Sequence, residues 1–151
     1  MPIKRVTPAG AIKRAIDRRV DNIVRAIVNN LVFVGEKLIE HARDSHRKRY
    51  TDRTGNLTSS IGYVVLVNGK AVSQSDFQEV KGPEKGAGKG SKIGKNFLKK
   101  LIADNSEGIV FIAVAGMPYA AYVERKNLDV LDSAEMMAAD MIPRMMEKLK
   151  F

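Results

Sequence analysis

A single apolar stripe at helical spacing runs from Pro8 to Arg49, and no other feature restricts the possible folds as strongly. Its members are Ile12, Ile16, Val20, Ile23, Ile27, Leu31, Val34, Leu38 and Ala42. Steps of three and four residues predict one long helix with little left-handed supercoiling. At about 1.5 Å per residue it would reach roughly 60 Å, which exceeds the diameter of a domain of this size. Neither Asn29-Asn30 nor Gly35 offers a proline that would force a kink, so we expect one end to leave the domain and meet a neighbouring subunit.

The periodicity changes after Thr54-Gly55-Asn56, where the chain turns from helix to strand. Glycine tolerates a positive φ and asparagine can bond its own backbone, so this is a turn. We expect Leu57 and Ile61 to pack back onto the preceding helix, while residues 58–60 face water or the backbone.

A hairpin is predicted over residues 61–75, because Asn68-Gly69 lies between two β-branched runs. Its first strand is apolar on both faces, so we expect one face to pack on the helix. The other face then needs a cover from this chain or from another subunit, which makes Tyr63 and Val65 interface candidates. The continuous apolar run Ile109–Ala115 predicts a central strand covered on both faces.

Three shorter elements complete the predicted fold. A short helix is expected over 95–104 and a tight helical turn over 117–124, after Pro118. The last helix is expected over 132–150, with Asp132 and Glu135 as a capping box and Pro143 as a kink or restart. The sequence therefore predicts an α+β fold. A small antiparallel sheet, made of a hairpin and a central strand, is packed by a long N-terminal helix and a C-terminal helix in a single domain over residues 1–151.

The composition is that of a globular protein, with 44% hydrophobic and 28% charged residues. No apolar run approaches the ~20 residues of a membrane span, and residues 1–10 lack the apolar centre of a signal peptide. Because cysteine is absent, neither a disulfide framework nor a thiolate site is available. These features favour a protein made in the cytoplasm, with no membrane partner.

The net charge of +9 favours an anionic partner, and residues 81–95 concentrate glycine and lysine. A phosphate-binding P-loop is rejected here, since Pro83 stands where the motif needs glycine and Gly90 where it needs Ser or Thr. We expect a flexible basic loop that contacts DNA phosphates or an acidic protein surface. Its candidate residues are Lys81, Lys85, Lys89, Lys92 and Lys95.

No catalytic or metal-binding pattern is found. The two histidines, His41 and His46, are five residues apart and diverge around a helix, so they make a poor metal pair. Asp17 and Asp21 lie among arginines of the same helix and are expected to form surface ion pairs. We therefore expect no enzyme activity, no cofactor and no metal.

Two short segments, Thr-Gly-x-Leu-x-x-Ser-Ile and Tyr-Ala-x-Tyr-Val-Glu, follow the long helix and the apolar strand respectively. In this order they resemble the gene-product-ten-like tail-component family of tailed phages. The resemblance implies a neck or tail-completion subunit at the head–tail junction of a virion. The residues that carry it are Thr54, Gly55, Leu57, Ser60, Ile61, Tyr119, Ala120, Tyr122, Val123 and Glu124.

Two functions remain open from the sequence. One is a structural subunit that forms a ring, of six or twelve copies, between the portal and tail proteins. The other is a basic protein that binds nucleic acid through non-specific phosphate contacts. Basic residues are interleaved with acidic ones rather than gathered on one element, which favours the assembly subunit. The expected interface residues are Ile12, Ile16, Val20, Tyr63 and Val65.

Overall fold

The structure is a computed structural model that describes residues 2–4, 6–44 and 50–150. Within these residues it is an α+β fold of five helices and one three-stranded antiparallel sheet, as the sequence predicts. The helices are α1 (Ala11–Arg43), α2 (Asn56–Ser59), α3 (Gly90–Ala103), α4 (Ala120–Arg125) and α5 (Asp132–Glu147). The strands are β1 (Ile61–Val67), β2 (Lys70–Gln74) and β3 (Ile109–Ala115).

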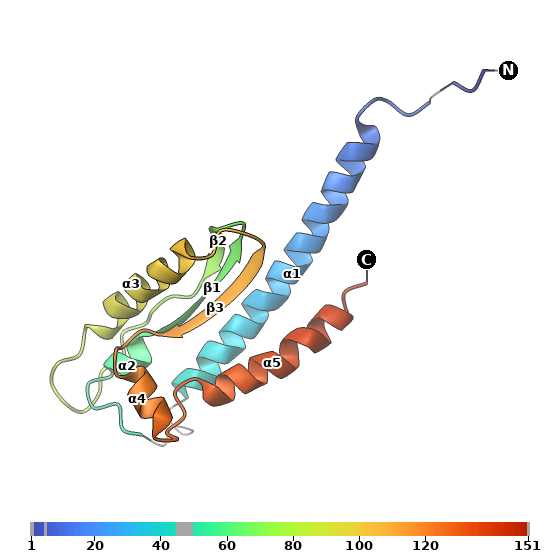
Figure 1. Ribbon diagram of the computed structural model, residues 1–151. Helices are drawn as coiled ribbons and strands as arrows, with labels where there is room; N and C mark the ends of the chain where they lie inside the picture. The colour runs from blue at the N-terminus through green and yellow to red at the C-terminus, as the bar shows by residue number, and fades with distance from the viewer. Residues whose placement is uncertain (1, 5, 45–49, 151) are drawn as a thin grey trace.

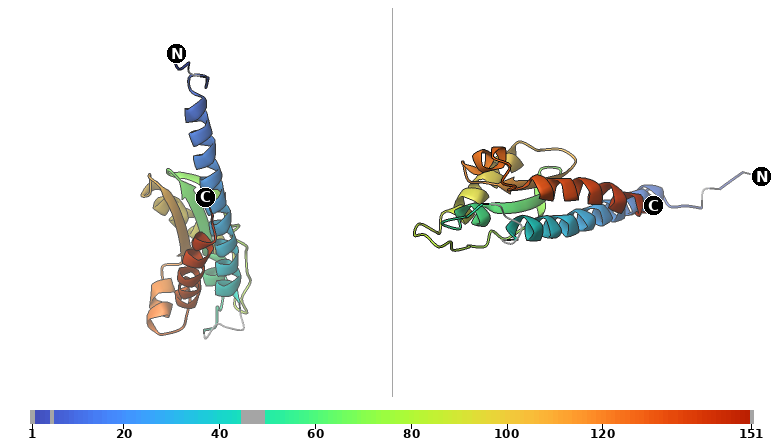
Figure 2. Two further views of the ribbon diagram at one scale, coloured as in Figure 1. Left: turned by 90° about the vertical axis from the view of Figure 1, so that its right-hand side faces the viewer. Right: turned by 90° about the horizontal axis from the view of Figure 1, so that it is seen from below.

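The helix α1 is unbroken from Ala11 to Arg43 and is about 50 Å long at ~1.5 Å per residue. It starts three residues after Pro8, because Gly10 has a φ of 83° and interrupts the helical backbone. The N-terminal part of α1 extends well beyond the sheet and α5 (Figures 1 and 2), as expected for a helix longer than its domain. The predicted basic end of the helix, residues 45–49, lies outside the described residues.

The sheet has the strand order β2-β1-β3. The hairpin is confirmed: Asn68 and Gly69 join β1 to β2 with φ values of 48° and 78°. The prediction that Ile109–Ala115 is the central strand is wrong, because β1 lies in the centre and β3 at an edge. An apolar run shows that both faces of a strand are covered, but it carries no information about the strand's neighbours.

Helices cover both faces of the sheet (Figure 1), with α1 and α5 on one side and α3 on the other. On the α1 side, Tyr63 and Val65 are 1% and 0% exposed, so their prediction as oligomer interface residues is wrong. The opposite side chains of β1 pack against Phe77 and Leu98. The second cover comes from α3, which begins at Gly90 rather than near residue 95 and spans 14 residues.

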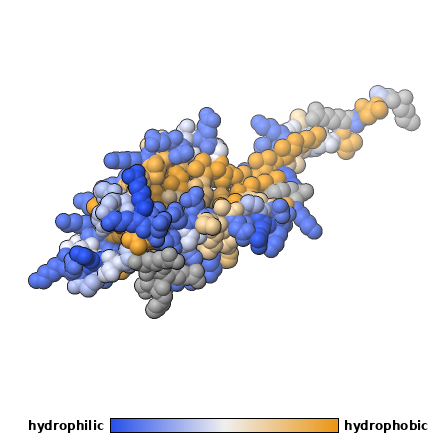
Figure 3. All heavy atoms as spheres, turned by 60° about the horizontal axis from the view of Figure 1, so that its bottom comes forward, coloured by the Kyte–Doolittle hydropathy of each residue, from blue (hydrophilic) through white to orange (hydrophobic). Residues whose placement is uncertain are grey.

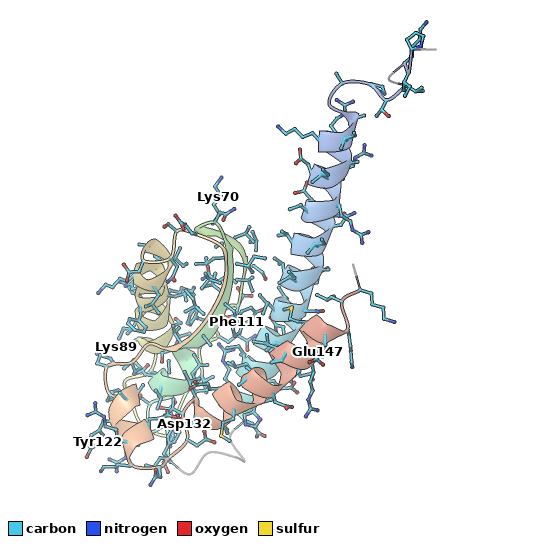
Figure 4. All side chains as sticks on the ribbon, turned by 45° about the vertical axis from the view of Figure 1, so that its right-hand side comes forward. Lys70, Lys89, Phe111, Tyr122, Asp132 and Glu147 are labelled. Atoms are coloured by element: carbon cyan, nitrogen blue, oxygen red, sulfur yellow. The ribbon has the colours of Figure 1, made fainter. Side chains whose placement is uncertain are left out.

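The C-terminal helix α5 packs along α1 and remains one helix through Pro143 rather than restarting there. It ends at Glu147, before the predicted residue 150. Methionines on its inner face, including Met137 and Met141, join the core cluster of α1. Figure 4 shows Phe111 on β3 between the sheet and α1, where its ring lies 5.8 Å from that of Tyr63.

Candidate functional site

The two segments that carry the family resemblance meet at one end of the molecule, although they are about sixty residues apart in sequence. They line a common cavity of about 460 Å³ between the turn before α2 and the helix α4. Tyr122, labelled in Figure 4, lies on α4 at this end and is 60% exposed. Residues of the resemblance that line the cavity are Thr54, Leu57, Tyr119, Tyr122 and Val123.

The first segment forms a tight turn whose geometry is fixed by backbone contacts. The carboxylate of Asp52 accepts hydrogen bonds from the backbone N–H of Gly55, at 3.0 Å, and of Thr58, at 2.7 Å. Gly55 has a φ of 79°, and a Cβ there would lie 1.9 Å from the carbonyl oxygen of Val80. Glycine is required at this position both for its φ and for the close approach of the chain.

The serines after this turn are buried and bond the backbone, one of the two environments predicted for them. Ser59 Oγ donates to the Gly55 carbonyl at 2.7 Å and accepts from the Val80 N–H at 2.7 Å. Ser60 Oγ donates to the Leu57 carbonyl and accepts from the Met117 N–H at 3.2 Å, which joins the two segments.

The two apolar residues of the turn, Leu57 and Ile61, pack in different core clusters. Ile61 joins the α1 core as predicted. Leu57 does not pack on the preceding helix; it packs with Ala120 and Val130 at the α4 end. The turn of α2 rotates Leu57 away from α1, and spacing alone could not show this rotation.

Glu124, at the end of the second segment, stabilises the start of α5. Its carboxylate accepts hydrogen bonds from the backbone N–H of Val130, Leu131 and Asp132, the last at 2.8 Å. The pKa of Glu124 is raised, chiefly because burial disfavours the charged carboxylate. Asp132 is not the N-cap, so the predicted capping box is wrong: Leu131 occupies the N-cap position, and Glu124 supplies the acceptors.

The basic segment is held to the same end of the molecule by Asn56. The Asn56 amide donates to the Gly86 carbonyl at 2.9 Å, and its oxygen accepts from the N–H of Lys89 and Gly90. The loop ends at Lys89 because α3 begins at Gly90, so the predicted extent to residue 95 is wrong.

The predicted lysines are therefore divided between two elements. Lys81, Lys85 and Lys89 lie in the loop, whereas Lys92 and Lys95 are exposed on α3. Lys99 follows on the same side of α3, since three and four residues complete about one helical turn. Lys89, labelled in Figure 4, lies near α4 at the end where the two segments meet.

One side-chain cluster combines the residue types of a nucleophilic triad. His41 Nε2 lies 2.8 Å from Ser133 Oγ, which donates to Asp129 Oδ2 at 2.6 Å. The serine hydroxyl therefore donates its hydrogen bond to the carboxylate. In a nucleophilic triad the hydroxyl would donate to the histidine, and the carboxylate would orient the histidine. Asp129 also accepts from the Ser133 N–H at 2.9 Å, so the cluster holds the first turn of α5 against α1.

The described residues contain no group of three or more His, Cys, Asp or Glu side chains that could hold a metal ion. His46, one of the two histidines, lies outside them. None of the helices described is long and apolar enough to cross a membrane.

The projecting part of α1, residues 11–25, is here called the arm. Three predicted interface residues, Ile12, Ile16 and Val20, lie on it and are 59%, 58% and 49% exposed. They are four residues apart and so share one face. Figure 3 shows the apolar band continuing from the body of the molecule along this helix. Exposed apolar patches of this kind are typical of interaction surfaces.

Sequence reasoning identified the arm but missed the buried role of Asn56 and the capping role of Glu124. The Thr54-Gly55-Asn56 turn indicated a local bond for Asn56, whereas its partners are thirty or more residues away. For Glu124 the only sequence signal was the resemblance. Comparison of the chain with protein-family models, with curated proteins and with solved structures found no match.

Proposed function

We propose that this protein is a structural subunit of a tailed-phage or prophage neck. It assembles in the host cytoplasm into a homo-oligomeric ring at the head–tail junction of the virion, between the portal-side proteins and the tail. The observation that carries self-assembly is the exposed row Ile12, Ile16 and Val20 on the arm. The resemblance in the two motif segments is the support for the place of the ring in a virion.

The rest of the chain is consistent with an assembly role. The hydrogen bonds of Asn56, Ser60 and Glu124 serve the fold, since each joins backbone groups of different segments. The His41 and Ser133 pair lacks the order of a catalytic triad. We propose accordingly that the protein acts by contact with other subunits and not as an enzyme.

Contact with packaged DNA is the second candidate, and the exposed lysines of α3 favour it. Lys92, Lys95 and Lys99 follow one side of the helix and are not covered by other described elements. A row of this kind fits the regular phosphates of a duplex without reading its sequence. In the assembled ring this contact would accompany the structural role.

The test is the particle mass in solution and in neck complexes or virions. We expect the wild-type chain to form particles that are several times the subunit mass of 16.7 kDa. Ile16→Asp should raise the protein concentration needed for half-maximal assembly at least tenfold, because it places a charge in the apolar row. Its melting temperature should change little, since Ile16 is exposed within the subunit.

Asn22→Asp is the matched control, because it adds the same charge on the other side of the arm. A chain that stays monomeric at high concentration and is absent from virions would contradict the proposal. Equal loss of assembly in Ile16→Asp and Asn22→Asp would show that charge, rather than the apolar row, is responsible.

A further inference from the structure

The edge strand β3 is apolar and lacks the charges and prolines that commonly protect a sheet edge. Among the described residues it pairs only with β1, and Ile109–Ala115 contains neither a charged residue nor a proline. Natural proteins protect such edges with charges, prolines or bulges, or cover them with a helix or loop. This edge therefore needs a cover.

A shallow groove follows the C-terminal end of β3, where α3, α4 and the start of α5 meet. It encloses about 310 Å³ and continues into a second hollow of about 540 Å³ that shares Phe97, Ala115, Ala120 and Ala121 with it. Alanines and Gly116 make much of its floor, so another backbone can approach closely. Its wall includes Phe97, which is 42% exposed.

The arm and this groove lie at opposite ends of the molecule. In Figures 1 and 2 the arm projects past one end of the sheet, while α4 lies at the other end. The arm is continuous with α1, which is packed on the sheet by Leu31, Val34 and Leu38. One chain therefore cannot place its own arm in its own groove.

The charges beside the apolar row of the arm are basic on both sides. At about 100° per residue, Lys13 and Arg19 lie roughly 60° on either side of the midline of Ile12, Ile16 and Val20. Asp17 and Asp21 lie farther from that midline, at roughly 100° and 140°. Two arms packed face to face would therefore bring like charges together.

The groove offers the opposite charge at its α5 end. The carboxylates of Glu124 and Asp132 line it there, and Glu135 follows in the first turn of α5. Lys100 lines the continuation at the other end. An apolar helix with basic flanks fits a groove with an apolar floor and an acidic rim.

We propose that the arm of one copy docks in the β3 groove of the next copy. Ile12, Ile16 and Val20 then lie against the alanines of the groove, and Lys13 or Arg19 lies near Asp132. The contact is head-to-tail, so each subunit uses its arm on one neighbour and its groove on the other. Repetition of such a contact gives a closed ring if the rotation closes and a filament if it does not. The inference rests on the proposed self-assembly and names the surfaces that carry it.

The experiment uses two variants of the full chain, Ile16→Asp in the arm and Ala121→Arg in the groove. Ala121 is exposed on α4 and lines both hollows, so a long cation there fills the groove without disturbing the core. Each variant alone should remain at the subunit mass of 16.7 kDa. An equimolar mixture should form a dimer of twice that mass and nothing larger, because one intact arm meets one intact groove.

Ala139→Arg, which changes another exposed alanine on α5 that does not line the groove, is the control and should assemble like wild type. Melting curves should show that all variants are folded. A mixture that stays monomeric, or Ala121→Arg that assembles like wild type, would overturn the arm-to-groove contact while the proposed function stands. A wild-type chain that never assembles would overturn both.

Discussion

The ring of Tyr63 occupies the space that a side chain at position 35 of α1 would need. A Cβ on Gly35 would lie 2.5 Å from Tyr63 Cε2, closer than real Cβ contacts. The glycine allows the tyrosine to pass beneath α1, and the Tyr63 hydroxyl then donates to Glu36 Oε1 at 2.6 Å. This contact fixes the central strand against the long helix.

Gly35→Ala should therefore destabilise the protein, although alanine is the better helix former. Overpacking in a closed core costs about 1–3 kcal/mol, which exceeds the ~1 kcal/mol that alanine gains over glycine in a helix. Urea unfolding measures the difference. Asn29→Ala, an exposed site on the same helix, should be neutral or stabilising, and equal behaviour of the two variants would contradict the close contact.

Asn56→Ala should release the basic loop from the turn before α2. It removes the donor to Gly86 and the acceptor for Lys89 and Gly90 in a residue that is 6% exposed. Unmet buried polar groups cost about 1–3 kcal/mol each, so the melting temperature should fall. Trypsin should cut after Lys85 and Lys89 faster than in wild type or in the control Asn96→Ala, an exposed site on α3. Unchanged cleavage would show that Asn56 does not hold the loop.

Glu124→Gln should weaken the start of α5. Glutamine retains the size of the side chain but turns an amide donor toward the N–H groups of residues 130–132. Loss of a helix cap costs about 0.5–2 kcal/mol, and thermal unfolding should show a decrease of this order. Glu135→Gln, an exposed first-turn carboxylate, should change stability by a few tenths of a kcal/mol. A larger loss of stability in Glu135→Gln than in Glu124→Gln would contradict the assignment of Glu124 as the cap of α5.

The stabilising effect of the Tyr63 hydroxyl should decline in alkaline solution. Burial, and next the hydrogen bond to Glu36, raise the pKa of Tyr63 from 10.0 to about 12. The folded state therefore holds its proton more tightly than the unfolded state. This contribution is complete below pH 10 and is lost as the pH rises toward 12.

The comparison is between wild type and Tyr63→Phe. Below pH 10 the wild type should be more stable by about 1 kcal/mol, the net value of one hydrogen bond. This advantage should shrink between pH 10 and pH 12 in urea titrations, whereas a constant difference would contradict the raised pKa. Glu36→Gln, which removes the neighbouring charge, should make the decline smaller and end at a lower pH, because the charge helps to raise the pKa of Tyr63 in the folded state only.

Replacement of Lys85, Lys89 and Lys92 by alanine should lower affinity for any duplex at low salt and reduce its salt dependence. Each lost phosphate contact lowers the slope of log K against log[salt] by about 0.9. Fluorescence anisotropy at several salt concentrations measures both quantities. Replacing Lys70, Lys148 and Lys150, which are exposed outside the loop and α3, removes the same charge as a control. Equal losses of duplex affinity in the two triple variants would show that net charge alone causes the effect. No loss of affinity in the first variant would exclude DNA contact by this segment.

The sequence by itself determined the long helix, the three strands and the class of the fold. The stripe of α1, the Asn68-Gly69 turn and the apolar run of β3 each carry local signals, because periodicity and turn chemistry act within a few residues. The same stripe also showed that α1 exceeds its domain, since helix length follows directly from residue number. Ile12, Ile16 and Val20 are exposed because they lie on the part of α1 that extends beyond the domain.

Only the tertiary structure decided which surfaces remain open. β1 and β3 are apolar on both faces, so their patterns could not show which of them lies at the edge. Tyr63 and Val65 were expected at an interface, but they pack against α1, while the opposite side chains of β1 pack under α3. Which face of an apolar strand meets which helix depends on tertiary packing. The bonds of Asn56 and Glu124 depend on how distant turns are placed in space. Burial is set by contacts between remote segments, and no local spacing records them.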